Sequence, residues 1–175
     1  MMDNTKQQEE FSQIYDKYID KIYRFIFLKV NSMETAEDLS SEVFTRCWRK
    51  FQDNHDNPAV IENPQAFLYQ VARNIVVDHY REKSKAQFVS TDFASVIDPR
   101  ADIKERVEFS SDLCMIRTAL TGLKNEYQEM IIWHYLDDLS IPEISNILSK
   151  PEGTIRVALH RAIKSLKKEF ERHEA

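Results

Sequence analysis

The sequence predicts an all-α fold, arranged as two small helical domains joined by a flexible linker. Only two glycines and five prolines occur among the 175 residues, and apolar residues recur at helical spacing over long stretches. A sheet-based fold would need more turn residues and shorter, alternating apolar patterns. No apolar run is long enough for a membrane span, and the first residues are polar and acidic where a signal peptide is basic and then apolar. We therefore expect a cytoplasmic protein.

The first domain is expected over residues 8–83 and contains three helices. The first helix covers about residues 8–30, and its core stripe consists of Phe11, Ile14, Tyr15, Tyr18, Ile22, Phe25 and Ile26. A capping signal at residues 31–34 starts the second helix, which runs to about residue 51 and turns inward Ala36, Leu39, Val43, Phe44, Cys47 and Trp48. The third helix starts at Asn63 and Pro64, a cap followed by a proline at the first helical position, and ends near Lys83. Its inward residues are Leu68, Val71, Ala72 and Ile75.

Residues 84–109 form the predicted linker, because the helical periodicity fades there. The second domain is expected over residues 110–173. Its first helix covers about residues 112–122 and places Gly122 where a C-cap glycine belongs. Its second helix, at about residues 125–138, is dense in apolar residues.

The last two helices are predicted to form a helix-turn-helix. Ser140 and Glu143 have the spacing of a capping box and start a short helix. That helix must end before Pro151, because the residue that precedes a proline is pushed out of the α region. A longer helix then begins at Pro151 or Glu152. Its core stripe consists of Ile155, Ala158, Leu159, Ala162, Leu166 and Phe170.

The outer face of this final helix is basic. Residues 154–168 contain five Lys or Arg and no acid, in a chain whose net charge is −5. The second helix of a helix-turn-helix presents its first residues to base edges in the major groove, and here these are Glu152, Thr154, Arg156 and Val157. The pattern predicts DNA binding by a local patch. The alternative is a plain helical hairpin with a solvated basic end, which the helix dipole would also favour.

Three segments carry a resemblance to a known family. They are AEDLSSEVFTRCWRKF at residues 36–51, PQAFLYQVARNIVVDHYREK at residues 64–83, and LSIPEISNILSKPEGTIRVALHRAIKSL at residues 139–166. With these three segments in this order, the chain resembles a bacterial RNA polymerase sigma factor of the extracytoplasmic-function (ECF) class. The resemblance implies a promoter-specificity subunit whose partners are core RNA polymerase and promoter DNA. An anti-sigma factor is a further partner compatible with the resemblance. It implies no catalytic site, cofactor or small-molecule substrate.

The second helix is the polymerase-binding element that the resemblance implies, through Asp38, Ser41 and Glu42. The residues themselves agree with this, because Glu37, Asp38, Ser41 and Glu42 recur at helical spacing and give one acidic face that can accept bonds from arginines. Ser41 departs from the family, which usually has a longer glutamine there. Acids placed in the first turn for the helix dipole are the simpler explanation for Glu37.

The third helix corresponds to the part of the family that captures and melts the minus-ten element. Its residues predict an outer face on which Tyr69, Arg73, Val76 and Tyr80 mix aromatic and basic side chains, as suits unstacked bases and their phosphates. The resemblance implies minus-ten contacts by Tyr69, Arg73, Asn74, Asp78, Tyr80 and Arg81. It also implies that the loop at residues 52–62 forms a pocket for one flipped base.

The final helix corresponds to the reader of the minus-thirty-five element. The implied contact residues are Glu152, Thr154, Arg156, Val157, His160, Arg161 and Lys164. The chain departs from the family at Ser149, where glycine is frequent, and at Pro151, where serine is frequent. Arginines are common where Ala158 and Ile163 stand, so fewer phosphate contacts are expected.

Two other function classes make different demands on the sequence. A helix-turn-helix regulator with an N-terminal sensing domain would bind DNA tightly without polymerase, usually as a dimer. An enzyme would need catalytic or metal-binding groups from the five histidines, His55, His79, His134, His160 and His173, which lack any H-x-x-x-H or H-E-x-x-H spacing. The chain also has no Gly-rich phosphate loop, and Cys47 and Cys114 are too isolated for a zinc site or a disulfide framework. Both cysteines are predicted to be core residues.

Overall fold

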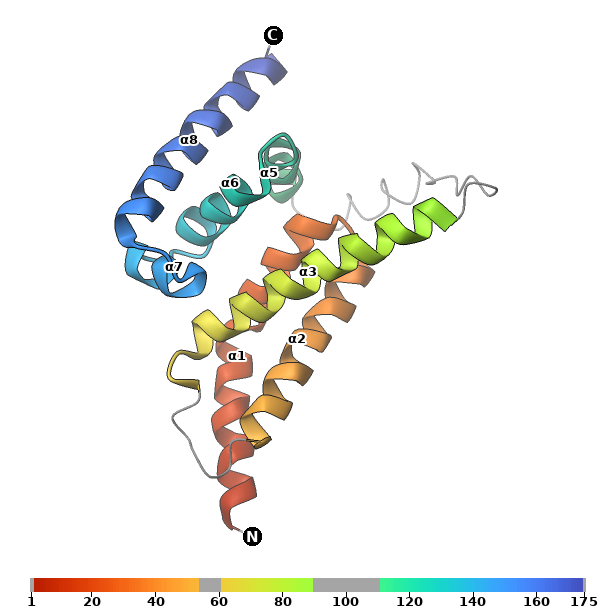
Figure 1. Cartoon of the computed structure of the whole chain (residues 1–175), viewed down its shortest axis with the longest axis vertical. Helices are drawn as coiled ribbons and strands as arrows, with labels where there is room; N and C mark the ends of the chain where they lie inside the picture. The colour runs from red at the N-terminus through yellow and green to blue at the C-terminus, as the bar shows by residue number, and fades with distance from the viewer. Residues whose placement is uncertain (1, 54–60, 90–110, 175) are drawn as a thin grey trace. The chain divides into compact units, whose positions relative to one another are not determined.

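The computed structural model describes residues 2–53, 61–89 and 111–174. Within these ranges every regular element is a helix, which confirms the predicted all-α class (Figure 1). The chain divides into two compact units, one with helices α1 to α3 and one with helices α5 to α8. No helix in the described part of the chain is long and apolar enough to cross a membrane.

In the first unit, α1 (Met2–Val30) and α2 (Met33–Asp53) form an antiparallel hairpin. Only Asn31 and Ser32 join them, and Asn31 takes the left-handed conformation with φ of 62°. Asparagine tolerates this conformation better than most residues, so the chain can reverse direction without a glycine. The Ser32 hydroxyl accepts a hydrogen bond from the Thr35 N–H at 3.2 Å, which confirms the predicted start of the second helix.

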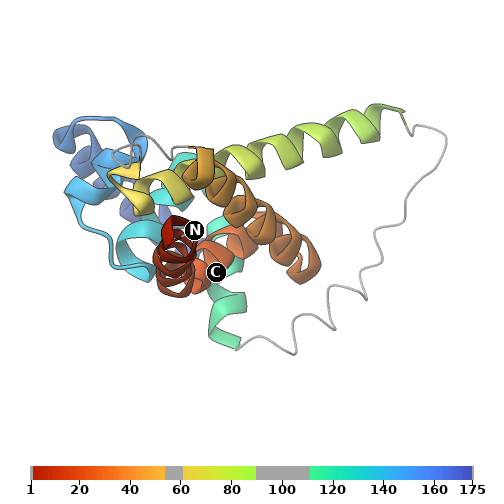
Figure 2. The same ribbon diagram turned by 90° about the horizontal axis from the view of Figure 1, so that it is seen from below.

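Helix α3 (Pro64–Val89) crosses both members of the hairpin (Figures 1 and 2). The Asn63 side chain accepts a hydrogen bond from the Ala66 N–H at 3.0 Å, so the predicted cap and proline start are confirmed. The helix ends six residues later than Lys83, the end expected from its periodicity. Residues 84–89 lack an apolar stripe but also lack any proline or glycine, and a helix without a core face can continue into solvent.

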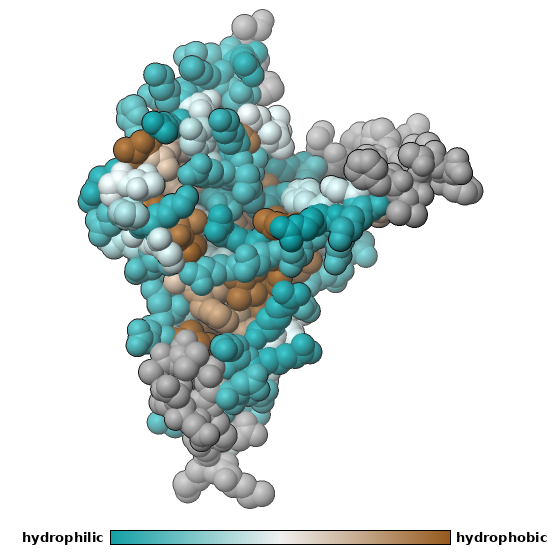
Figure 3. Space-filling model, viewed as in Figure 1, coloured by the Kyte–Doolittle hydropathy of each residue, from teal (hydrophilic) through white to brown (hydrophobic). Residues whose placement is uncertain are grey.

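The core of the first unit lies where α3 meets the hairpin. Among its fully buried side chains are Ile22, Phe25, Val43, Leu68 and Tyr69, and the rings of Phe25 and Tyr69 meet edge to face at 5.7 Å between centroids. Figure 3 shows apolar side chains gathered between α2 and α3 and bordered by hydrophilic ones. Burial of such side chains is the main stabilising contribution to folding.

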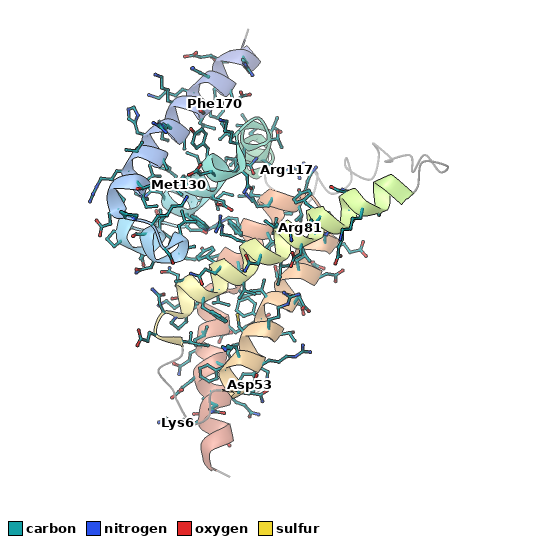
Figure 4. All side chains as sticks on the ribbon, viewed as in Figure 1. Lys6, Asp53, Arg81, Arg117, Met130 and Phe170 are labelled. Carbon is teal, nitrogen blue, oxygen red and sulfur yellow. The ribbon has the colours of Figure 1, made fainter. Side chains whose placement is uncertain are left out.

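The second unit contains α5 (Ser111–Thr121), α6 (Asn125–Ile131), a π-helical turn η2 (Ile132–Leu136), α7 (Ile141–Leu148) and α8 (Glu152–Glu174). The three shorter α-helices all pack against α8. Met130 is fully buried and lies between α6 and α8 (Figure 4). Trp133, Ile144 and Ile155 complete the centre of this core.

The single helix expected at residues 125–138 changes character at its end. The Asp137 N–H donates to the Ile132 carbonyl at 2.9 Å, and the Leu139 N–H donates to the Trp133 carbonyl at 2.8 Å. The first of these bonds joins residues five apart and defines a π-turn, which apolar periodicity does not distinguish from an α-turn over so short a span. Asp138 then adopts a φ of 57° and turns the chain toward α7.

Two expectations about the second unit are corrected. Gly122 follows α5 as predicted but does not have a positive φ, so it is not a left-handed C-cap glycine. It instead leaves room for Glu169, whose carboxylate oxygen would lie 2.3 Å from a Cβ at this position. Phe170 was expected in the core stripe but is 45% exposed, because the last turns of α8 extend beyond the shorter helices (Figure 4).

Candidate nucleic-acid interface

Helix α7 begins with the predicted capping box. The Ser140 hydroxyl accepts a hydrogen bond from the Glu143 N–H at 3.3 Å, and the Glu143 carboxylate accepts one from the Ser140 N–H at 2.7 Å. Pro142 lies in the first turn, where its missing N–H is not needed. Leu139 and Ile144 are both buried beside this start. Local sequence therefore determines where the first helix of the motif begins.

The turn between α7 and α8 is tight despite lacking glycine. Ser149 has a φ of 52°, the left-handed conformation that glycine adopts most easily. The Lys150 N–H donates to the Ser145 carbonyl at 3.3 Å, and the Ser145 hydroxyl donates to the Lys150 carbonyl at 2.5 Å. Pro151 follows, and its carbonyl accepts from the Thr154 N–H at 3.0 Å. Serine thus reproduces a conformation that the family often assigns to glycine.

Helix α8 places the predicted contact residues at the surface. Its core side is formed by Ile155, Ala158, Leu159 and Ala162, which are all buried. Six predicted residues are exposed: Thr154, Arg156, Val157, His160, Arg161 and Lys164. The seventh, Glu152, is partly exposed and lies 3.0 Å from the Arg156 guanidinium. The structure therefore joins Glu152 and Arg156 in an ion pair at the start of the helix.

A hollow of about 340 Å³ lies where the first turns of α8 meet the start of α6. Its lining residues are Glu126, Tyr127, Gly153, Thr154, Val157, Ala158 and Arg161. Sequence reasoning did not identify this hollow or assign a role to Gly153. The available signal was a glycine inside a helix, which is unfavourable for the helix itself.

The outer face of α3 carries most of the residues implied for the minus-ten element. Asn74, Asp78, Tyr80 and Arg81 are exposed, and Arg73 is partly exposed. Asp78 and Arg81 lie 3.6 Å apart, and both side chains are more than half exposed. Val77 is a further exposed apolar residue on this helix that the sequence argument did not single out.

Two residues expected on that outer face are not there. Tyr69 and Val76 are both buried, so their predicted placement was wrong. The reason is that α3 packs against α1 as well as α2, which makes its buried face wider than a single apolar stripe. The Tyr69 ring is used in the core, against Phe25, and is not available for stacking on a base.

Tyr80 is held in place by its hydroxyl group. The hydroxyl donates a hydrogen bond to the backbone carbonyl of Lys29, near the end of α1, while the side chain stays 43% exposed. Partial burial raises the pKa of the Tyr80 hydroxyl above its usual value. The ring therefore lies at the surface in a fixed orientation, as an aromatic platform requires.

Several sequence predictions fall outside the described residues. The expected base pocket at residues 52–62 includes residues 54–60, and the linker at residues 84–109 includes residues 90–109, which are not described. His55 belongs to the first of these gaps, and the side chains of Cys114 and His173 are likewise not described. These predictions stay as predictions.

The outer face of α2 has the acidic character expected for polymerase binding. Asp38 and Ser41 are exposed and Glu42 is partly exposed. Glu42 lies 2.7 Å from the Arg46 side chain one turn later, so part of its charge is already paired. An exposed pair of this kind contributes little to stability and can exchange partners.

A groove of about 620 Å³ adjoins this face, between α1 and α2. Aromatic residues dominate its lining, with Phe11, Tyr15 and Tyr23 from α1 and Phe44 and Trp48 from α2. Tyr15 was expected in the core but is 42% exposed. The Ser40 hydroxyl also lines the groove, is buried, and has no hydrogen-bond partner among the described residues. The number of aromatic residues along α1 was the available signal for this surface.

Cys47 and His134 have structural surroundings. Cys47 is buried as predicted, and desolvation raises the pKa of its thiol to about 12. A ring nitrogen of His134 lies 2.8 Å from the Leu139 carbonyl, beside the π-turn. Within the described ranges, no group of three or more His, Cys, Asp or Glu residues could hold a metal ion.

Comparison with known proteins matches each of the two units to a known family model. The family model for Sigma-70 region 2 matches residues 14–86, and the model for Sigma-70 region 4 matches residues 115–166. The chain is 29% identical to the ECF RNA polymerase sigma factor SigW of Bacillus subtilis over 172 residues, which cover 93% of this chain and 90% of SigW. It is 29% identical to SigM of the same organism over 164 residues, covering 91% of this chain and 94% of SigM.

Solved structures support the same fold. The sigma factor RpoE of Bartonella quintana, solved with the anti-sigma factor NepR, has a TM-score of 0.69 at 19% identity and covers 93% of this chain and 98% of its own. CnrH, solved with the cytosolic domain of CnrY, has a TM-score of 0.66 at 17% identity, with coverage of 94% of this chain and 90% of its own. A three-helix unit followed by a helix-turn-helix unit, matched in that order by the region 2 and region 4 models, defines a member of the sigma-70 family, which is not a family of enzymes. With these relatives, the chain belongs to the ECF class of RNA polymerase sigma factors.

Proposed function

We propose that the chain binds core RNA polymerase through the outer face of α2 and reads promoter DNA with α3 and α8. Membership of the sigma factor family gives the general role, which is to direct polymerase to promoters. The assignment of surfaces is our own. The observation that carries it is the helix-turn-helix with an exposed basic face on its second helix, in an otherwise acidic chain.

Helix α8 is proposed to read the minus-thirty-five element from its N-terminal end. Thr154, Arg156 and Val157 lie in the first turns, where a recognition helix contacts base edges. Arg161 and Lys164 lie further along, where the DNA backbone would pass. Ala158 and Ile163 offer no charge, so these two positions make no ionic phosphate contact.

Helix α3 is proposed to hold the opened minus-ten element. The half-exposed ring of Tyr80 supplies a stacking surface, and Arg73 and Arg81 supply positive charge beside it. Asn74 and Asp78 are exposed polar groups on the same helix and can bond to base edges. Tyr69 is omitted from this set because it is buried.

Partners and location follow from this role. Core polymerase and promoter DNA are the working partners, and work with them supports the proposal of a cytoplasmic location. An anti-sigma factor is a further proposed partner, because the solved relatives RpoE and CnrH were each captured with a second protein, NepR and CnrY. We propose no catalytic activity, cofactor or metal for the chain itself.

The decisive experiment mixes the purified chain with core polymerase and transcribes genomic DNA fragments. The expected result is a stable complex that starts transcription at a defined set of promoters, whereas the chain alone binds the same DNA weakly because of its net charge of −5. Tight, dimeric binding by the chain alone, without any complex with polymerase, would favour a helix-turn-helix regulator instead.

A further inference from the structure

Gly153 stands in the first turn of α8, where the fold itself does not require a glycine. A Cβ at this position would meet no other atom within 4 Å, and the residue does not have a positive φ. Glycine weakens a helix relative to alanine, because it loses more backbone freedom on folding. The helix is therefore less stable than it could be, at a position where its own surroundings would accept a side chain.

The other glycine of the chain is different. A Cβ at Gly122 would lie 2.3 Å from a carboxylate oxygen of Glu169, so the space is already used by a side chain of the same unit. At Gly153 the space belongs to the hollow between α6 and α8, which opens at the surface. Glycine is the residue that permits close approach of another molecule to a backbone.

The lining of the hollow indicates the chemistry of its occupant. Arg161 supplies a positive charge, and Thr154 and Tyr127 carry hydroxyl groups. Glu126 is the acid in the lining, and its carboxylate lies 3.9 Å from the Lys150 ammonium, which offsets its charge. Val157 and Ala158 add apolar surface. A ligand with an anionic group and an adjoining apolar ring fits this combination.

We propose that the sugar–phosphate backbone of one promoter strand enters this hollow, and that the missing side chain of Gly153 admits it. Deoxyribose supplies the apolar part and the phosphate supplies the charge that Arg161 would meet. The inference rests on the proposed role of α8 as the minus-thirty-five reader. It adds a backbone contact that sets how deeply the first turn of α8 lies in the major groove.

The test uses two matched variants of the full chain, each bound to core polymerase. Gly153→Ala and Gly122→Ala add the same methyl group at the two glycines of the sequence, one in the hollow and one outside it. The probes are promoter duplexes in which a single phosphate of the minus-thirty-five element is replaced by an uncharged methylphosphonate, one position at a time.

The wild-type complex should bind less tightly when one particular phosphate is neutralised. Gly153→Ala should bind the unmodified promoter several-fold more weakly, lose its sensitivity to that phosphate, and show a salt dependence shallower by about one phosphate contact. Its melting temperature should not fall, because alanine strengthens the helix. Gly122→Ala should keep both the affinity and the phosphate sensitivity, without any gain in melting temperature, since Glu169 must move.

Two results would overturn the inference: wild-type binding by Gly153→Ala, or a loss of binding that accompanies a lower melting temperature. The Arg156→Ala variant distinguishes a failure of the hollow assignment from a failure of the proposed reading role of α8. If Arg156→Ala changes base preference while Gly153→Ala binds normally, only the assignment of the hollow fails. If the wild-type complex shows no preference among minus-thirty-five sequences, the proposed reading role fails, and the hollow assignment fails with it.

Discussion

Ser149 is the residue on which the geometry of the helix-turn-helix depends most directly. Its left-handed φ of 52° is unfavourable for a residue with a Cβ, by about 1 kcal/mol, and a serine side chain offsets little of this. Asn31 and Asp138 hold the same conformation at two other joints, but their side chains tolerate it better. The turn therefore contains some local backbone strain at Ser149.

Ser149→Gly is expected to raise the free energy of unfolding of the second unit by up to about 1 kcal/mol, because it removes that strain at the cost of a more flexible unfolded chain. Denaturant unfolding followed by circular dichroism measures the change. Ser149→Ala keeps a Cβ and serves as the control, with no gain expected. A less stable glycine variant would contradict the account of the turn.

Cys47 provides a pH-dependent test of the first core. Burial raises the pKa of its thiol from an ordinary value of 9.0 to about 12. A raised pKa in the folded state means that the unfolded chain loses the proton first, so this group stabilises the fold fully below pH 9 and loses that contribution as the pH rises toward 12. Unfolding midpoints measured between pH 8 and 11 should fall more steeply for the wild type than for Cys47→Ala. Parallel curves would mean that the thiol is not desolvated.

At the scale of the element, the outer face of α2 allows a direct test of polymerase binding. Reversing charge at Asp38 and Glu42 should weaken the complex with core polymerase without reducing helix content, because both side chains lie at the surface. The loss should reach about 2 kcal/mol or more if the pairs become desolvated in the complex, against less than about 1 kcal/mol for pairs that stay exposed.

The matched control reverses charge at Glu171 and Glu174, which are exposed near the end of α8 and change the net charge equally. Affinity for core polymerase, measured without DNA, should stay near wild type in this control. Equal affinities in both double variants would reject the assigned face.

The helices were predictable from the sequence where local chemistry decides them, and less so where packing decides them. The starts of α2, α3 and α7 follow from Ser32, Asn63 and Ser140, each of which caps its helix with a side-chain oxygen. The buried positions of Tyr69 and Val76 could not be read from one stripe, since the second packing partner of α3 is known only after folding. The exposure of Phe170 depends in the same way on how short its neighbouring helices are.

The candidate site, like the helices, was predictable from the sequence only where features within one helix decide it. The exposed face of α8 follows from periodicity and charge, so its contact residues could be named in advance. The hollow at Gly153 and the aromatic groove beside α2 arise between helices, and no spacing within one helix encodes them. Their traces in the sequence were a glycine inside a helix and an excess of aromatic residues.

At the scale of the whole molecule, two compact units predict two independent folding events. Fragments divided between Asp98 and Pro99 should each be helical, because each unit contains its own buried core. Their summed circular dichroism should equal that of the full chain. If either fragment is unfolded while the intact chain is helical, the units stabilise one another and the chain is one cooperative domain.

If Tyr80 stacks on a promoter base as proposed, the hydrogen bond from its hydroxyl to the Lys29 carbonyl affects the speed and strength of promoter opening. A free surface tyrosine loses side-chain freedom each time a base stacks on it, and that loss opposes binding. Tyr80 has already lost this freedom during folding, so a base that arrives at its ring meets a preorganised surface. Phenylalanine at this position would offer the same ring without the anchor, and the unpaired base would be captured less often and released sooner.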